Sequence, residues 1–113
     1  MAITEKPLVW MGSSREDVRG FSDDGRRAAG YQLRRVQVGL MPDDWKPLTT
    51  VGAGVYELRI HRGTEYRVLY VAKFEEAVYV LHAFEKRTRR TRETDIALAR
   101  RRLAAVRALR GQR

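Results

Sequence analysis

The sequence is 113 residues long, which fits a single domain spanning residues 1–113 around one hydrophobic core. It contains no cysteine, which excludes disulfides and thiolate metal sites and favours a reducing compartment such as the cytoplasm. No stretch approaches the roughly 18 apolar residues that a membrane span needs, so we expect a soluble protein without a membrane partner.

The charge of the chain is strongly positive and uneven. There are 23 Lys and Arg against 14 Asp and Glu, a formal net charge of +9. Residues 86–113 carry the whole excess, with eleven basic and two acidic residues, whereas residues 1–85 balance. This asymmetry suits a polyphosphate partner, whose binding is driven by release of condensed counterions. The alternative is an ordinary solvated helix face.

The first part of the chain predicts one short strand and two helices. Residues 8–10 form an apolar run typical of a strand. Ser13 and Glu16 have the spacing of a capping box, which predicts a helix ending near residue 21. Residues 22–24 offer further helix-starting side chains, and the apolar spacing after them predicts a second helix ending near Gly39.

The second half predicts a sheet followed by a helix. Residues 41–54, rich in Pro and Gly, are typical of a loop. Segments 55–60, 66–73 and 77–84 are rich in β-branched and aromatic residues and predict an antiparallel meander. Residues 94–110 place apolar residues along one stripe with arginines mostly elsewhere, which predicts an amphipathic basic helix.

The turn positions of the meander predict a row of cations across its three strands. Arg59 is expected opposite Arg67, and Arg67 opposite His82, on one sheet face. Glu57 could supply a neighbouring acid. Alternation within the first strand would let Val55, Glu57 and Arg59 face water. A slip of one residue at either turn would move a member of the row to the other face.

Such a row fits RNA cleavage without a metal or cofactor, in which the 2′-hydroxyl attacks the adjacent phosphorus. Arginine pairs with phosphate oxygens and never loses its proton, so it can stabilise the charge that develops on phosphorus. His82 is of the type that transfers protons near neutral pH. Lys86 and Arg87 follow the last strand and could hold the RNA backbone.

Plainer interpretations remain open. His82 could be a structural hydrogen-bonding residue. Arg59 and Arg67 could have no role other than to form weak ion pairs with Glu57 and Glu65. His61, beside a turn, is interpreted as solvated.

Several runs of the sequence resemble one known family. Tyr-Glu-Leu-Arg-Ile at 56–60, Tyr-Arg-Val-Leu-Tyr at 66–70 and Tyr-Val-Leu-His-Ala-Phe-Glu-Lys at 79–86 occur in the order and spacing of the RelE/ParE toxin superfamily. Residues 6–10 and 12–14 are similar to its phage-derived HigB-like branch of type II toxin–antitoxin toxins. The resemblance covers nearly the whole chain.

The resemblance implies an α+β, RelE-like fold, with a small antiparallel sheet packed against two N-terminal helices and a basic C-terminal helix. It also implies a toxin that cleaves messenger RNA on the ribosome, without a metal or cofactor. The implied partner is a cognate antitoxin, a HigA-like helix-turn-helix protein, through which alone the toxin would reach operator DNA.

Arg67 and Arg87 match arginines of the family site, and Arg59 falls near a basic position of it. His82 lies in a pattern common in the HigB-like branch. The expected catalytic set is Arg59, Arg67, His82 and Arg87. The expected RNA-binding set is Lys46, Lys86, Arg89 and Arg90.

Two other functions stay open at this point. ParE-like members of the superfamily bind DNA gyrase and do no RNA chemistry, and a shared fold cannot separate the two activities. A nucleic-acid-binding module without activity is the third interpretation, and it would show salt-sensitive binding without arrest of growth.

Overall fold

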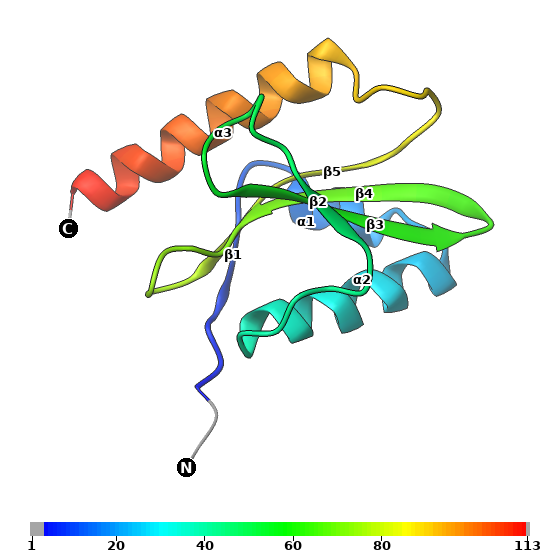
Figure 1. Ribbon diagram of the computed structural model, residues 1–113, viewed down its shortest axis with the longest axis horizontal. Helices are drawn as coiled ribbons and strands as arrows, with labels where there is room; N and C mark the ends of the chain where they lie inside the picture. The colour runs from blue at the N-terminus through cyan, green and yellow to red at the C-terminus, as the bar shows by residue number, and fades with distance from the viewer. Residues whose placement is uncertain (1–3, 113) are drawn as a thin grey trace.

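The computed structural model describes residues 4–112 as an α+β protein in which helices cover both faces of one sheet. In Figure 1, α3 runs along one face of the sheet and α2 along the other. The elements are β1 (Leu8–Trp10), α1 (Ser14–Arg19), α2 (Asp23–Gln37), β2 (Trp45–Pro47), β3 (Val55–Arg62), β4 (Thr64–Val71), β5 (Val78–Glu85) and α3 (Glu93–Gly111). The arrangement is consistent with a RelE-like fold. None of the described helices is long and apolar enough to cross a membrane.

The sheet has five strands in the order β1-β5-β4-β3-β2. The predicted meander of β3, β4 and β5 is antiparallel. The sheet as a whole is mixed, because β1 runs parallel to β5 and pairs with residues 78–80. Lys6, just before β1, also donates hydrogen bonds to the carbonyls of Ala72 at 2.7 Å and Phe74 at 2.9 Å. The small antiparallel sheet expected from the sequence is therefore part of a larger sheet that also contains the parallel strand β1.

The segment 41–54, expected to be a loop, contains the edge strand β2. Lys46 lies opposite Glu57 in this pairing, and Pro47 lies opposite Tyr56. A proline is tolerated here because only one side of an edge strand is hydrogen-bonded. Three residues are too few to show a strand period, which explains why the sequence did not reveal this strand.

The two N-terminal helices begin where the sequence predicts. Ser22 caps α2, and its hydroxyl accepts a hydrogen bond from the amide of Gly25 at 3.1 Å. The predicted capping box of α1 is wrong, because Ser13 instead donates to the carboxylate of Asp17 at 2.8 Å.

The core consists of two layers separated by the sheet. On the α1 and α2 side, Leu33 packs with Leu58 and Tyr70. On the other side, Leu69 packs with Leu103 of α3. Each layer excludes water from a different face of the same strands.

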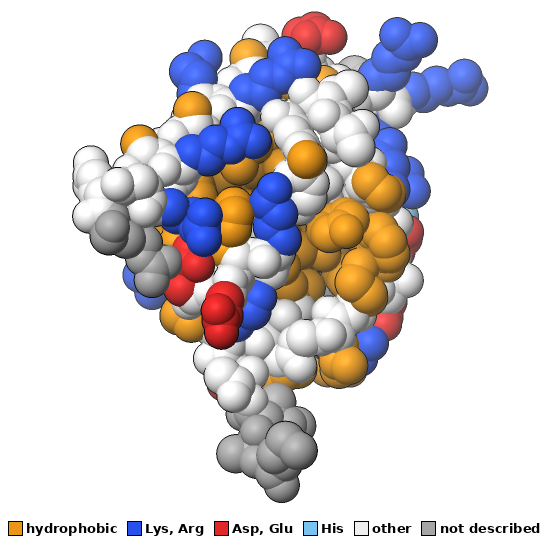
Figure 2. Space-filling model, turned by 60° about the vertical axis from the view of Figure 1, so that its left-hand side comes forward, with side chains coloured by type: hydrophobic (Ala, Val, Ile, Leu, Met, Phe, Trp, Pro, Cys, Tyr) orange, Lys and Arg blue, Asp and Glu red, His pale blue; other side chains and the backbone are white. Residues whose placement is uncertain are grey.

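Because α3 lays its apolar stripe on the second face, that face is not open to water as predicted. Val55 and Glu57 are buried there. The outward side of α3 carries Arg100, Arg101 and Arg107, all exposed. Figure 2 shows basic side chains gathered in the upper part of the molecule, over this helix.

The pairing of β3 with β4 follows the prediction, and Arg59 lies opposite Arg67. The pairing of β4 with β5 does not, because Arg67 lies opposite Phe84 and His82 lies opposite Leu69. Two shifts of one residue cause the difference. The connection between these strands is longer than expected, spanning residues 72–77, and a bulge interrupts the ladder between Leu69 and Tyr70. Since the shifts add to two residues, His82 returns to the face that carries Arg67.

Candidate functional site

A buried carboxylate surrounded by three cations lies at the centre of the sheet face that α3 partly covers. The side chain of Glu57 is 0% exposed, and its Oε1 lies 3.4 Å from Arg67 Nε, 3.6 Å from Arg59 Nε and 3.8 Å from Lys46 Nζ. These four residues, which we call the Glu57 cluster, come from β2, β3 and β4. The cluster therefore brings together Arg59, Arg67 and Lys46 of the residues predicted from sequence.

The loop between β5 and α3 closes one side of the cluster. Thr91 of this loop donates a hydrogen bond to Glu57 Oε2 at 3.0 Å. Among the described residues, Glu57 Oε1 and the Nε atoms of Arg59 and Arg67 are buried without a hydrogen bond of good geometry. Buried charges without good hydrogen bonds are costly, so this packing is a poor way to stabilise a fold. It is a suitable way to hold positive charge ready for an anion.

Lys86 lies beside the same cluster, just after β5. Burial lowers the pKa of its ammonium, and the nearby cations Arg67, Lys46 and Arg59 lower it further, whereas Glu57 acts in the opposite direction. Its backbone amide donates to the carbonyl of Glu65 at 2.7 Å. The backbone contact keeps the start of the loop against β4.

The remaining predicted basic residues lie on the open part of the loop. Arg87 is 71% exposed, and its guanidinium lies 3.2 Å from the carboxylate of Glu85. Arg89 and Arg90 are exposed. These side chains form a basic rim next to the cluster rather than a part of it.

His82 is buried and packed beneath α3. Its Nε2 lies 2.7 Å from Asp95 Oδ1 in the first turn of α3, and its ring stacks on Phe84 with centroids 5.0 Å apart. Its Nδ1 is buried and has no hydrogen-bond partner among the described residues. The ring shares a sheet face with Arg67, but these contacts hold it between a strand and a helix, which is the structural alternative left open by the sequence.

His61, which was interpreted from the sequence as solvated, contacts two acidic side chains. Its ring lies between two carboxylates, with Nδ1 2.7 Å from Glu65 and Nε2 in contact with Asp44. Hydrogen bonds to Asp44 and then to Glu65 raise the pKa of the imidazole above its usual 6.5. The predicted pairing of Arg59 with Arg67 already placed His61 opposite Glu65, so the signal was present in the sequence.

Comparison with known protein families shows to which family the chain belongs. Residues 16–104 match the family of phage-derived proteins described as Gp49-like (DUF891). The chain belongs to the Gp49-like family. A comparison with curated proteins finds no match.

The family match covers every predicted site residue of this Gp49-like protein. It begins within α1 and ends within α3, so the Glu57 cluster and the basic loop lie inside it, whereas β1 lies outside.

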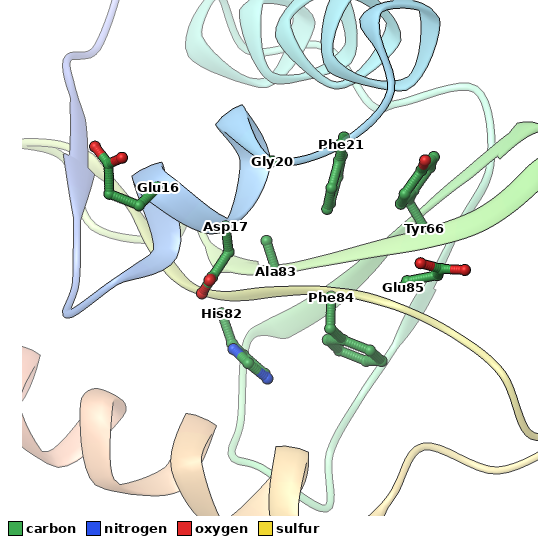
Figure 3. A pocket seen from close by; sticks show the side chains of 9 residues that line it. All are labelled: Glu16, Asp17, Gly20, Phe21, Tyr66, His82, Ala83, Phe84 and Glu85. Carbon is green, nitrogen blue, oxygen red and sulfur yellow. The ribbon is translucent and has the colours of Figure 1, made fainter.

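The Gp49-like protein also has a hollow of about 430 Å³ between α1 and β5. Glu16, Asp17 and Glu85 line it, together with aromatic residues. Figure 3 shows Phe21 and Tyr66 on one side of β5, and His82 and Phe84 on the other. Its acidic lining would repel a phosphate, so we place the candidate nucleic-acid site at the Glu57 cluster rather than here.

Proposed function

We propose that this Gp49-like protein is the toxin of a type II toxin–antitoxin system, of the HigB-like kind, and that it cleaves messenger RNA on the ribosome without a metal. The observation that carries the proposal is the Glu57 cluster, in which Lys46, Arg59 and Arg67 surround one buried carboxylate. Lys46, Lys86, Arg59 and Arg67 outnumber the three carboxylates that face them, which are Glu57, Asp44 and Glu65, and this leaves positive charge to attract a phosphate.

The chemistry requires charge stabilisation and proton transfer. The 2′-hydroxyl loses its proton, its oxygen bonds to phosphorus, and the bond from phosphorus to the 5′ oxygen breaks. The products are a 2′,3′-cyclic phosphate and a 5′-hydroxyl. Arg59 and Arg67 supply planar donors for the phosphate oxygens as negative charge grows there. A donor set prepared in advance needs little reorganisation during the reaction.

The surrounding surface supports binding to RNA. Lys86 lies beside the cluster, and Arg87, Arg89 and Arg90 form the basic rim on the loop that follows. Contacts of this kind hold the RNA backbone without reading its sequence. The ribosome would then decide where the messenger is presented.

The proposal includes a partner. A stored toxin has to be neutralised, and we propose a cytoplasmic HigA-like helix-turn-helix antitoxin that covers the cationic face and alone contacts operator DNA. Co-expression of the neighbouring reading frame should restore growth. Failure of that frame to bind and to rescue would remove the antitoxin from the proposal.

The test is to map RNA 5′ ends across the transcriptome after brief induction in bacteria. The native protein should create new 5′-hydroxyl ends within translated frames, and Arg59→Ala and Arg67→Lys should not. Arg67→Lys keeps the buried charge, and circular dichroism checks that both variants fold. Arg101→Ala, which removes an exposed arginine of α3, is the matched control.

Growth arrest without new RNA ends would refute the nuclease and favour a gyrase-binding protein. Absence of both effects would leave a nucleic-acid-binding module.

A further inference from the structure

His61 extends the row of functional side chains toward the open end of the sheet face. It lies two residues beyond Arg59 on β3, so both side chains point to the face that carries the Glu57 cluster. The side chain of His61 is 49% exposed, whereas that of Arg67 is 4% exposed. Of these two side chains, His61 is therefore the more open to an approaching RNA strand.

Two carboxylates join this imidazole to the arginines. Glu65 Oε1 lies 2.7 Å from His61 Nδ1 and also accepts a hydrogen bond from Arg67 Nη1 at 3.2 Å. On the other side, Asp44 contacts His61 Nε2, and its Oδ1 lies 4.0 Å from Arg59 Nη1. The contacts form a closed ring of alternating charge. Its members in order are Glu57, Arg59, Asp44, His61, Glu65 and Arg67.

The surroundings of His61 favour its protonated form. Both ring nitrogens face carboxylate oxygens, and an imidazole can donate from both nitrogens only as the cation. The other charged groups around the ring are Asp43 from the loop before β2, and Arg59 and Arg62 from β3. The hydrogen bonds that the ring donates to Asp44 and Glu65 outweigh the opposing effect of burial and raise the pKa of the ring. The two hydrogen bonds therefore favour a proton on the ring, next to the arginines.

The side chains of His61, Asp44 and Glu65 do not form a metal site. Within residues 4–112, no group of three His, Cys, Asp or Glu is arranged to hold a metal ion.

His82, the histidine that the sequence favoured for proton transfer, is less suited to it. Its ring is buried against Phe84 and Asp95, and it borders the hollow whose acidic lining disfavours a phosphate. His61 lies at the exposed end of the row, and its ring can donate to a leaving oxygen once the hydrogen bond to Asp44 or to Glu65 opens.

We infer that His61 is the general acid that protonates the 5′ oxygen when RNA is cleaved, an inference that rests on the proposed ribonuclease function. As the 2′ oxygen bonds to phosphorus, the bond to the 5′ oxygen breaks and its electron pair stays on that oxygen. The 5′ oxygen takes a proton from the imidazolium of His61, and the neutral ring regains one from water. The proton of the 2′-hydroxyl passes to water.

The inference is tested with two messenger RNAs on programmed ribosomes, one natural and one carrying sulfur in place of the scissile 5′ oxygen. A thiolate leaves without being protonated, so a general acid is needed only for the natural RNA. We expect His61→Ala to slow cleavage of the natural RNA by about 10²- to 10⁴-fold and to cleave the sulfur RNA at close to the native rate. Arg59→Ala should slow cleavage of both RNAs.

His61→Arg separates proton transfer from simple charge. It keeps a cation between Asp44 and Glu65 but does not release a proton near neutral pH. It should therefore behave as His61→Ala does. Native-like cleavage of the natural RNA by either variant, or equal loss on both RNAs, would overturn the assignment. A native protein that cleaves neither RNA would instead refute the proposed function.

Discussion

Arg59 and Arg67 lie directly opposite each other on neighbouring strands, and the Nε atoms of both approach the same oxygen of Glu57. Like charges at opposed positions of a sheet repel each other. The buried carboxylate offsets that repulsion and lets two guanidinium groups share one small area. This relationship makes the sheet depend on Glu57 and underlies the proposed chemistry.

Replacing Glu57 by Gln should destabilise the protein. The change keeps the shape of the side chain but leaves the buried Arg67 with only the partly exposed Glu65 as counter-charge, and breaking a buried ion pair costs about 3–5 kcal/mol. Urea unfolding would measure the loss. Glu75→Gln removes an exposed carboxylate and should stay within about 0.5 kcal/mol of the native protein. Equal stability of the two variants would mean that Glu57 is not the counter-charge.

Replacing Asp95 by Asn should loosen the start of α3 and leave cleavage within a few-fold of the native rate. The carboxylate of Asp95 contacts the buried His82; Asn keeps an acceptor there but removes the charge, so the loss should not exceed the roughly 1.5–3 kcal/mol that a hydrogen bond to a charged group contributes. Amide hydrogen exchange in the first two turns of α3 would report the change. Glu93→Gln removes a neighbouring charge from the same turn without touching His82 and serves as the control. A large loss of cleavage in Asp95→Asn alone would return His82 to the catalytic set.

Removing Arg89 and Arg90 together should weaken RNA binding and make its affinity less dependent on salt. Each phosphate contact contributes about 0.7 to the slope of log affinity against log salt for a single strand, so the double alanine variant should lower the slope by about 1.4. Affinity measured from low to physiological salt would give the slope. Arg15→Ala with Arg27→Ala removes the same charge from α1 and α2, across the sheet, and should leave the slope unchanged. Equal slopes for all three proteins would remove the basic rim from the binding surface.

The ion pair of Glu76 with Arg110 should make the stability of the protein depend on pH in the acidic range. Hydrogen bonding to Arg110 lowers the pKa of Glu76 from 4.5 to about 2. Because the folded state favours the charged carboxylate, the stabilisation is complete above pH about 4.5 and disappears as the pH falls through about 2. Thermal unfolding should therefore show a Tm gap between the native protein and Arg110→Gln that narrows across this range.

The gap need not reach zero, because Arg110 also packs 3.8 Å from the ring centroid of Phe74. Arg107→Gln, on the exposed side of the same helix, should show no such narrowing. A gap that is constant with pH would contradict the assignment to Glu76.

The sequence predicted those features that depend on neighbouring residues. The turn at Gly63 sets the register that places Arg59 opposite Arg67, and Ser22 caps α2 as its residue type suggests. The sequence missed the features that depend on tertiary packing. The bulge near Leu69 leaves no mark in the apolar pattern, so the position of His82 was wrong by two residues.

The burial of the second sheet face was also not predictable from the alternation of polar and apolar residues in β3. Polar residues at alternate positions of β3 usually indicate a face open to water, yet Glu57 is buried there, where Thr91 of the loop before α3 hydrogen-bonds to it. The register predicted for β3 and β4 implies that His61 lies opposite Glu65, but the interpretation of His61 as solvated missed its contacts with two carboxylates.

The parallel pairing of β1 with β5 joins residues about 70 positions apart in the chain. Closing a loop of that length costs about 3.8 kcal/mol of entropy beyond a constant, whereas each antiparallel hairpin of β3, β4 and β5 closes a short one. We therefore expect the hairpins to form early and β1 to join late, so that this long-range contact slows folding. Until β1 joins, the outer edge of β5 is unpaired and can add a strand from another chain. Refolding at high protein concentration should consequently lose material to aggregation before the sheet is complete.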